Sequence, residues 1–150
     1  ALFIVSLCAT LLVGVGEELY FRGILPVSFQ ARHGAFVTLI ATSLLFGLGH
    51  TVGEVFENLP AALIAFQVSV LALNGLLYFG AFLATGRLWV VMVLHFLTDF
   101  GLRLNGGFGS SSDYTPGPAA IAITVLLGVL GFVLVVSAIR QDIRTKRALR

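Results

Sequence analysis

Ionisable side chains interrupt the apolar stretches of this sequence at three places, and their types could activate a water molecule. The three clusters are Glu17-Glu18-x-x-x-Arg22, Phe46-x-x-x-His50 and His95-x-x-x-Asp99. A carboxylate can take a proton from water, while imidazole groups can hold that water, donate hydrogen bonds or bind a metal ion. Two histidines and a free carboxylate therefore predict hydrolytic chemistry, with or without a metal.

The two glutamates of the first cluster are expected to do different work. Neighbouring helix residues lie about 100° apart, so Glu17 and Glu18 cannot point the same way. Glu18 and Arg22 stand at i, i+4 and can form an ion pair on one face. A charged residue at the bilayer centre costs about 2.5–3.5 kcal/mol on insertion scales, and this pairing leaves Glu17 without compensation. We expect a structural Glu18–Arg22 pair and a free Glu17; alternatively, both glutamates mark a helix end at the interface.

The histidine clusters allow both functional and structural interpretations. His95 and Asp99 share a helix face at i, i+4, so the carboxylate could orient the imidazole, or both could bind a metal or a substrate. They could also be a polar pair that joins two helices. His50 alone would be read as a helix-end residue, although Gly47 and Gly49 before it would let another backbone approach. Outside the clusters, Tyr78 and Trp89 fit an interfacial aromatic belt.

The composition indicates which solvent these clusters face. Hydrophobic residues make up 58% of the 150-residue chain and charged residues 11%, whereas soluble domains carry about 25% charged residues. Lipid must therefore be the main solvent. We predict an all-α fold, a multi-pass transmembrane helix bundle with about five spans in this segment. The expected spans are Leu2–Phe29, Gly34–His50, Pro60–Ala84, Leu88–Leu102 and Pro118–Ile139.

The distribution of charge predicts the topology. Residues 1–139 would form the membrane core and residues 140–150 a basic tail. With that tail in the cytoplasm, the turns that carry Arg32 and Arg87 are also inside, and the acidic loop with Glu54 and Glu57 is outside. The chain then starts outside, which is easiest to understand if further helices precede it. We expect a multi-pass integral membrane protein of the bacterial cell membrane or, otherwise, of the endoplasmic reticulum.

Several functional classes do not fit the motifs. No Gly-x-Ser-x-Gly turn, no second buried aspartate in a Gly-x-Gly-Asp setting and no His-Glu-x-x-His occurs, which argues against serine, aspartyl and site-2 zinc intramembrane proteases. The lone Cys8 gives neither a disulfide nor a zinc knuckle. The basic residues are few and mostly terminal, so no nucleic-acid partner is expected.

Three motifs in this order resemble the CAAX-protease and bacteriocin-processing (CPBP/Abi) family of intramembrane proteases, which is related to the CAAX prenyl endopeptidase. The resemblance covers about Val15 to Gly101 and includes the approach to His95 from Ala84. It implies site roles for the six clustered residues. Glu17 would be the general base, His50 would hold the water, Arg22 would fix Glu18, and His95 with Asp99 would stabilise the oxyanion.

Asp99 departs from the eukaryotic prenyl proteases, which have Asn at this place. An ionised aspartate cannot donate to an oxyanion, so Asp99 is protonated, orients His95 or helps bind a metal; we favour the orienting role. The resemblance leaves the cofactor open. Family members have been described as metalloproteases and as glutamate proteases, so Zn²⁺ held by Glu17, His50 and His95 stands beside a metal-free site.

The expected function is that of an intramembrane endopeptidase that hydrolyses membrane-associated or prenylated, CAAX-type peptides with a Glu-activated water and two histidines. Its partners would be the lipid bilayer and a peptide or protein substrate. The alternatives are a proton-coupled membrane carrier and a non-catalytic membrane scaffold. A protease requires Glu17, His50 and His95 to meet at one shared water or ion, whereas a carrier needs a path to both membrane faces. The physiological substrate and the oligomeric state stay open.

Overall fold

The structure, a computed structural model, describes residues 2–56, 59–104 and 118–148. Over these ranges every element is helical, which confirms the predicted all-α fold. The elements are α1 (Leu2–Glu18), the π-helix η1 (Leu19–Ile24), α2 (Leu25–Gln30), α3 (Ala35–Gly49), α4 (Thr51–Phe56), α5 (Ala61–Thr85), α6 (Leu88–Leu104) and α7 (Pro118–Ala148).

The predicted spans correspond to observed helices, with two differences. The short helix α4 forms directly after His50, where the sequence analysis expected a loop; it contains Gly53 but no proline, and the first proline after His50 is Pro60. Helix α7 continues to Ala148, past the predicted end of the span at Ile139. Its extension contains three arginines, with one lysine, one glutamine and one alanine, and all of these residue types favour helix.

The first helical run changes its winding in the middle. In η1 the backbone widens, and the amide of Leu25 donates to the carbonyl of Tyr20, five residues back. Pro26 follows directly; it has no amide hydrogen for the carbonyl of Arg22, and its ring would collide with that carbonyl in a regular α-helix. The π-helix relieves this conflict, and such segments are frequent at functional sites. Here it carries Arg22, one of the clustered residues.

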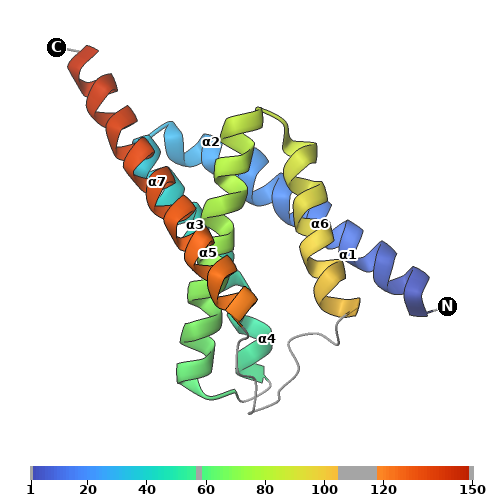
Figure 1. The fold of residues 1–150 in the computed structure, drawn as a ribbon. Helices are drawn as coiled ribbons and strands as arrows, with labels where there is room; N and C mark the ends of the chain where they lie inside the picture. Colours follow the sequence, from blue (N-terminus) through green and yellow to red (C-terminus); the bar gives the residue numbers. More distant parts are fainter. Residues whose placement is uncertain (1, 57–58, 105–117, 149–150) are drawn as a thin grey trace.

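The helices pack as a bundle around α5 (Figure 1). Helix α5 contacts α3, α6 and α7, while α1 runs along α6. Glycines permit the close approach of α3 to α5. A Cβ atom added to Gly47 would lie 2.6 Å from the carbonyl oxygen of Val68, and one added to Gly75 would lie 3.1 Å from Cα of Ser43. The expectation that a backbone approaches the Phe46–His50 segment is therefore confirmed for Gly47.

Two buried clusters form the core. Leu39, Phe79 and Ala138 join α3, α5 and α7, and Phe46, Tyr78 and Val91 join α3, α5 and α6. The second cluster packs against the ionisable residues: the rings of Phe46 and Tyr78 both contact the ring of His95.

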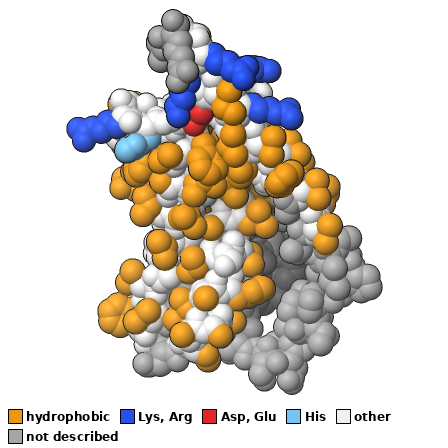
Figure 2. Space-filling view, turned by 90° about the vertical axis from the view of Figure 1, so that its left-hand side faces the viewer, with side chains coloured by type: hydrophobic (Ala, Val, Ile, Leu, Met, Phe, Trp, Pro, Cys, Tyr) orange, Lys and Arg blue, Asp and Glu red, His pale blue; other side chains and the backbone are white. Residues whose placement is uncertain are grey.

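The outer surface is apolar. Figure 2 shows hydrophobic side chains over the middle of one face, with lysine and arginine side chains gathered at one end. Among the described helices, Phe3–Gln30 and Ala61–Thr85 are long and apolar enough to cross a membrane, and Ala35–Gly49 and Leu88–Gly101 are shorter apolar helices. The fold is a multi-pass helical bundle whose lipid-facing exterior replaces the polar surface of a soluble domain.

Candidate active site

The base of the site is a buried cluster centred on Glu18. Its Oε1 accepts a hydrogen bond from Nη1 of Arg22 and another from Nδ1 of His95, each 2.8 Å long. Glu18 is 0% exposed, and Arg22 and His95 are 3% exposed. Arg22 also donates from Nη2 to the carbonyl of Gly75 and lies 4.4 Å from the ring centroid of Phe46. The guanidinium is thus held from three sides, and the predicted Glu18–Arg22 pair is present.

The bond to Glu18 fixes the ring of His95. An ionised carboxylate only accepts hydrogen bonds, so Nδ1 of His95 carries the proton and Nε2 points to the other side of the ring. On that side lies Glu17, whose Oε2 is 3.9 Å from Nε2. Glu18 therefore acts as the orienting carboxylate for His95, a role that the sequence analysis assigned to Asp99.

Asp99 approaches His95 from its outer side. Its Oδ2 lies 3.4 Å from Nε2 of His95, longer than a good hydrogen bond, and its side chain is 31% exposed. Of the two carboxylates near His95, Glu18 makes the shorter contact, because Arg22 holds it in place. Asp99 stands on a more open part of α6. Asp99 instead borders the opening of the site.

The reactive side of the site joins Glu17 and the two histidines. Oε2 of Glu17 lies 3.8 Å from Nε2 of His50 and 3.9 Å from Nε2 of His95. Both distances exceed a hydrogen bond, and Oε2 is a buried atom without a partner. His50 follows the end of α3, and its Nδ1 donates to the carbonyl of Phe46 at 2.9 Å, so Nε2 turns toward Glu17. The three groups expected to converge do so.

The gap between these three atoms suits a small hydrogen-bonding species. Two histidines and one carboxylate are also a donor set of hydrolytic zinc sites. In a tetrahedral zinc site, however, neighbouring ligand atoms lie about 3.3 Å apart, and no group of three such side chains in the described ranges has the spacing of a metal site. The donor types fit zinc and the spacing does not, whereas a water molecule can bridge atoms this far apart.

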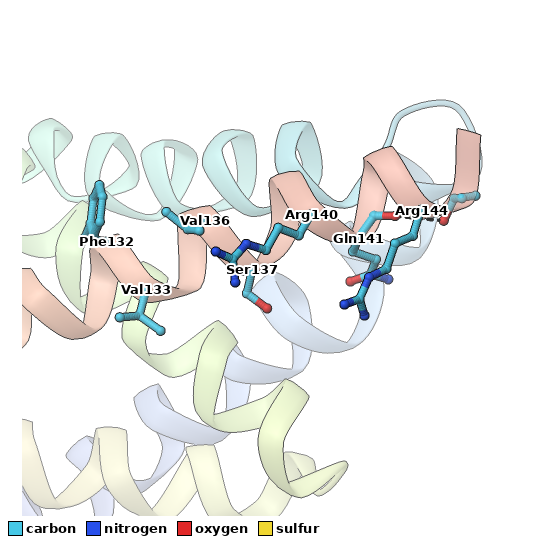
Figure 3. Close-up of a pocket in the computed structure, with 8 residues that line it drawn as sticks. Phe132, Val133, Val136, Ser137, Arg140, Gln141 and Arg144 are labelled. Atoms are coloured by element: carbon cyan, nitrogen blue, oxygen red, sulfur yellow. Dashed lines mark hydrogen bonds between the residues drawn. The ribbon is translucent and has the colours of Figure 1, made fainter. Parts of the chain in front are cut away.

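Burial separates the two glutamates as their spacing predicted. The side chain of Glu17 is 30% exposed and that of His50 is 34% exposed, while Glu18 is closed off. The free carboxylate thus faces the opening and the paired carboxylate supports it from behind. Two hollows along the described helices do not touch these residues: one lies along α7 (Figure 3) and the other between α2, α3, α5 and α7.

Tyr78 belongs to the site although the sequence analysis placed it in an interfacial belt. It is 8% exposed, and its ring stacks on that of His95 with the centroids 5.0 Å apart and the planes 24° from parallel. The belt expectation is wrong because this face of α5 turns toward α6 rather than toward lipid. No local spacing in the sequence indicated this position, because the contact depends on how α5 packs against α6. Trp89, by contrast, is 59% exposed.

The six residues expected at the site come from separate parts of the chain. Glu17 and Glu18 end α1, Arg22 lies in η1, His50 caps α3, and His95 and Asp99 are on α6. Comparison with known families identifies the region in which they lie. The family model of the type II CAAX prenyl endopeptidase Rce1-like proteins matches residues 1–101, which include all six. No curated protein sequence and no solved structure matches the chain significantly. Since the matched region covers most of the chain, the protein belongs to the type II CAAX prenyl endopeptidase Rce1-like family.

Proposed function

We propose that the chain is an intramembrane endopeptidase in which Glu17 activates water against a peptide bond. One observation carries the proposal. The free Oε2 of Glu17 faces Nε2 of His50 and Nε2 of His95 at 3.8 and 3.9 Å, distances too long for direct hydrogen bonds. Family membership supports peptidase activity of the CAAX type. The geometry supports Glu17 as the general base and His95 as the oxyanion donor.

The chemistry begins with proton transfer to Glu17. Nε2 of His50 and the Glu17 carboxylate both accept hydrogen bonds from the water, which aligns its oxygen with the scissile carbonyl carbon. As the oxygen–carbon bond forms, Glu17 takes the proton and the carbonyl electrons move to oxygen. When the carbon–nitrogen bond breaks, Glu17 returns that proton to the leaving amine, so the cycle ends with the carboxylate restored.

His95 is suited to stabilise the oxyanion. Protonated at both nitrogens, it donates from Nδ1 to Glu18 and directs its Nε2 hydrogen into the opening, where negative charge develops. The buried Glu18 carboxylate supports the positive imidazolium, and Arg22 pairs with the same carboxylate oxygen. Asp99 lies beside the same Nε2 and would hold its hydrogen before substrate enters. In this arrangement Asp99 accepts a hydrogen bond and is not required to donate one.

The substrate is proposed to be a membrane-associated peptide, including a prenylated CAAX-type tail. The opening lies among helices whose outer surfaces are apolar, so a lipid-modified peptide could approach from the membrane. A basic cytoplasmic tail at residues 140–150 and a location in the bacterial cell membrane, or else the endoplasmic reticulum, are part of the same proposal. A carrier would move protons without peptide cleavage, and a scaffold would do neither.

The test is cleavage of a panel of labelled peptides by purified protein in lipid nanodiscs. The panel contains farnesylated CAAX peptides, the same peptides without the farnesyl group and an unrelated transmembrane peptide. His50→Ala should abolish cleavage, whereas His33→Ala is the matched control because His33 is exposed in the turn after α2. Absence of cleavage for every peptide, or equal activity of both histidine variants, would contradict the proposal.

The same assay addresses the metal. Because the three atoms are spaced for water rather than for zinc, chelator-treated protein should keep its activity. Activity that disappears with chelator and returns with Zn²⁺ would show that the site contracts around a metal.

A further inference from the structure

A surface on α7 lies away from the candidate active site. Its residues, drawn in Figure 3, line a hollow along this helix. The hollow has a volume of about 690 Å³. Its lining includes Phe132 and Val136 at one end and Ser137, Arg140, Gln141 and Arg144 at the other. All the lining residues belong to α7 and form two adjacent rows at i, i+4 spacing, so the hollow, which we call the α7 groove, runs along one face of this helix. One half of this groove is apolar and the other is basic and polar.

The groove changes from apolar to basic at the depth where the hydrocarbon core of a bilayer would meet the lipid headgroups. The stretch Pro118–Ile139 contains no charged residue. At 1.5 Å per residue it is about 33 Å long, close to the thickness of about 30 Å of a hydrocarbon core. Phe132 and Val136 then lie at acyl-chain depth, and Arg140 lies where lipid phosphates begin. In Figure 3 the guanidinium group of Arg140 turns back toward Ser137 rather than away along the helix.

The two arginines of the groove have no protein anion to bind. Among the described residues, neither Arg140 nor Arg144 makes an ion pair or a side-chain hydrogen bond, and both are exposed. The nearby acidic side chain, Asp142, is engaged elsewhere. Its two oxygens accept from the amides of Ala35 and Phe36 at 2.6 and 3.1 Å, so it caps the start of α3. Two positive charges therefore face the groove without compensation.

A second hollow adjoins the first and is suited to an acyl chain. It has a volume of about 270 Å³, lies between α2, α3, α5 and α7, and shares Ser137 and Gln141 with the groove. Its walls include Leu39, Phe79 and Leu83. The shared polar residues mark the junction between a basic surface and an apolar slot. Basic pockets between membrane helices are a known setting for anionic lipid headgroups.

We propose that this α7 groove binds one anionic diacyl phospholipid. Arg140 and Arg144 bind its phosphate, and Ser137 and Gln141 donate hydrogen bonds at the glycerol level. One acyl chain follows Phe132 and Val136. Binding is non-covalent, and it does not depend on the proposed peptidase activity.

The test is native mass spectrometry of the full chain, released from micelles that contain equal amounts of dioleoyl phosphatidylglycerol and dioleoyl phosphatidylcholine. Wild type should retain one phosphatidylglycerol in preference to phosphatidylcholine. The double variant Arg140→Gln/Arg144→Gln should lose about ten- to thirtyfold in affinity for phosphatidylglycerol, as expected for two cations near a phosphate. Lys146→Gln/Arg147→Gln removes the same charge from the same helix outside the groove and should change the affinity less than about threefold.

Two outcomes would overturn the proposal. Equal losses in both double variants would mean that the tail attracts anionic lipid through its net charge alone. Displacement of the lipid by millimolar glycerol 3-phosphate would mean that the site recognises a free phosphate rather than a phospholipid. Val136→Trp is a further arm that leaves the charge unchanged: filling the apolar half should lower lipid retention, and unchanged retention would also contradict the proposal. Helix content by circular dichroism establishes that each variant is folded.

Discussion

Replacing Arg22 by alanine would leave the Glu18 carboxylate buried without its guanidinium partner. Glu18 is 0% exposed and the hydrogen bond from Arg22 is 2.8 Å long, so water cannot take the place of the lost cation. Breaking a buried ion pair from one side costs about 3–5 kcal/mol. The substitution also removes the contact between the guanidinium and the Phe46 ring and the hydrogen bond to Gly75. We expect a loss of about 3–5 kcal/mol in unfolding free energy, with a lower folded yield.

The assay is reversible unfolding of the purified protein in mixed micelles, followed by circular dichroism. Arg32→Ala is the matched control because Arg32 is exposed in a turn, and it should change the unfolding free energy by less than about 0.5 kcal/mol. A double variant, Glu18→Gln/Arg22→Ala, separates the charge effect from packing. It should be more stable than Arg22→Ala by at least about 1 kcal/mol, since the lone charge is gone. Wild-type stability of Arg22→Ala, or no recovery in the double variant, would refute this reasoning.

Three other substitutions test the remaining contacts. Asp99→Asn should keep cleavage within about threefold, because Glu18 orients His95; a loss of 10–100-fold in the cleavage assay would return that role to Asp99. Tyr78→Phe should keep the ring stack on His95 and most of kcat. Tyr78→Leu removes the ring and should lower kcat more than it changes KM. Equal kcat values for the two variants would argue against the stack as a positioning contact. Gly47→Val should lower the melting temperature by several degrees, because the valine side chain would collide with the carbonyl oxygen of Val68. An unchanged melting temperature would show that α3 and α5 can separate.

The sequence predicted the features that depend on local spacing. Apolar runs indicated the helices, and i, i+4 spacing predicted the Glu18–Arg22 pair. The convergence of Glu17, His50 and His95 followed from the cost of leaving ionisable groups separately in lipid. These predictions succeeded because each depends on helix geometry or on desolvation, both of which can be argued from residue types alone.

Features that depend on how helices pack could not be predicted in this way. The bond from His95 to Glu18 joins residues 77 positions apart, and spacing favoured the nearer Asp99. Tyr78 stacks on His95 because α5 lies against α6, which no local pattern records. Asp142 caps α3 across 107 positions for the same reason. The π-helix had a local cause in Pro26, but proline alone allows a kink or a break as well.

The central claim is that Glu17 takes the proton of the attacking water, and single-turnover cleavage by Glu17→Gln tests it most directly. The amide keeps the size of the side chain and cannot accept that proton. On a farnesylated CAAX peptide that wild type cleaves, the rate should fall by about 10²–10⁴-fold, while peptide binding and thermal stability stay at wild-type values. A Glu17→Gln variant that cleaves within tenfold of the wild-type rate would contradict the account.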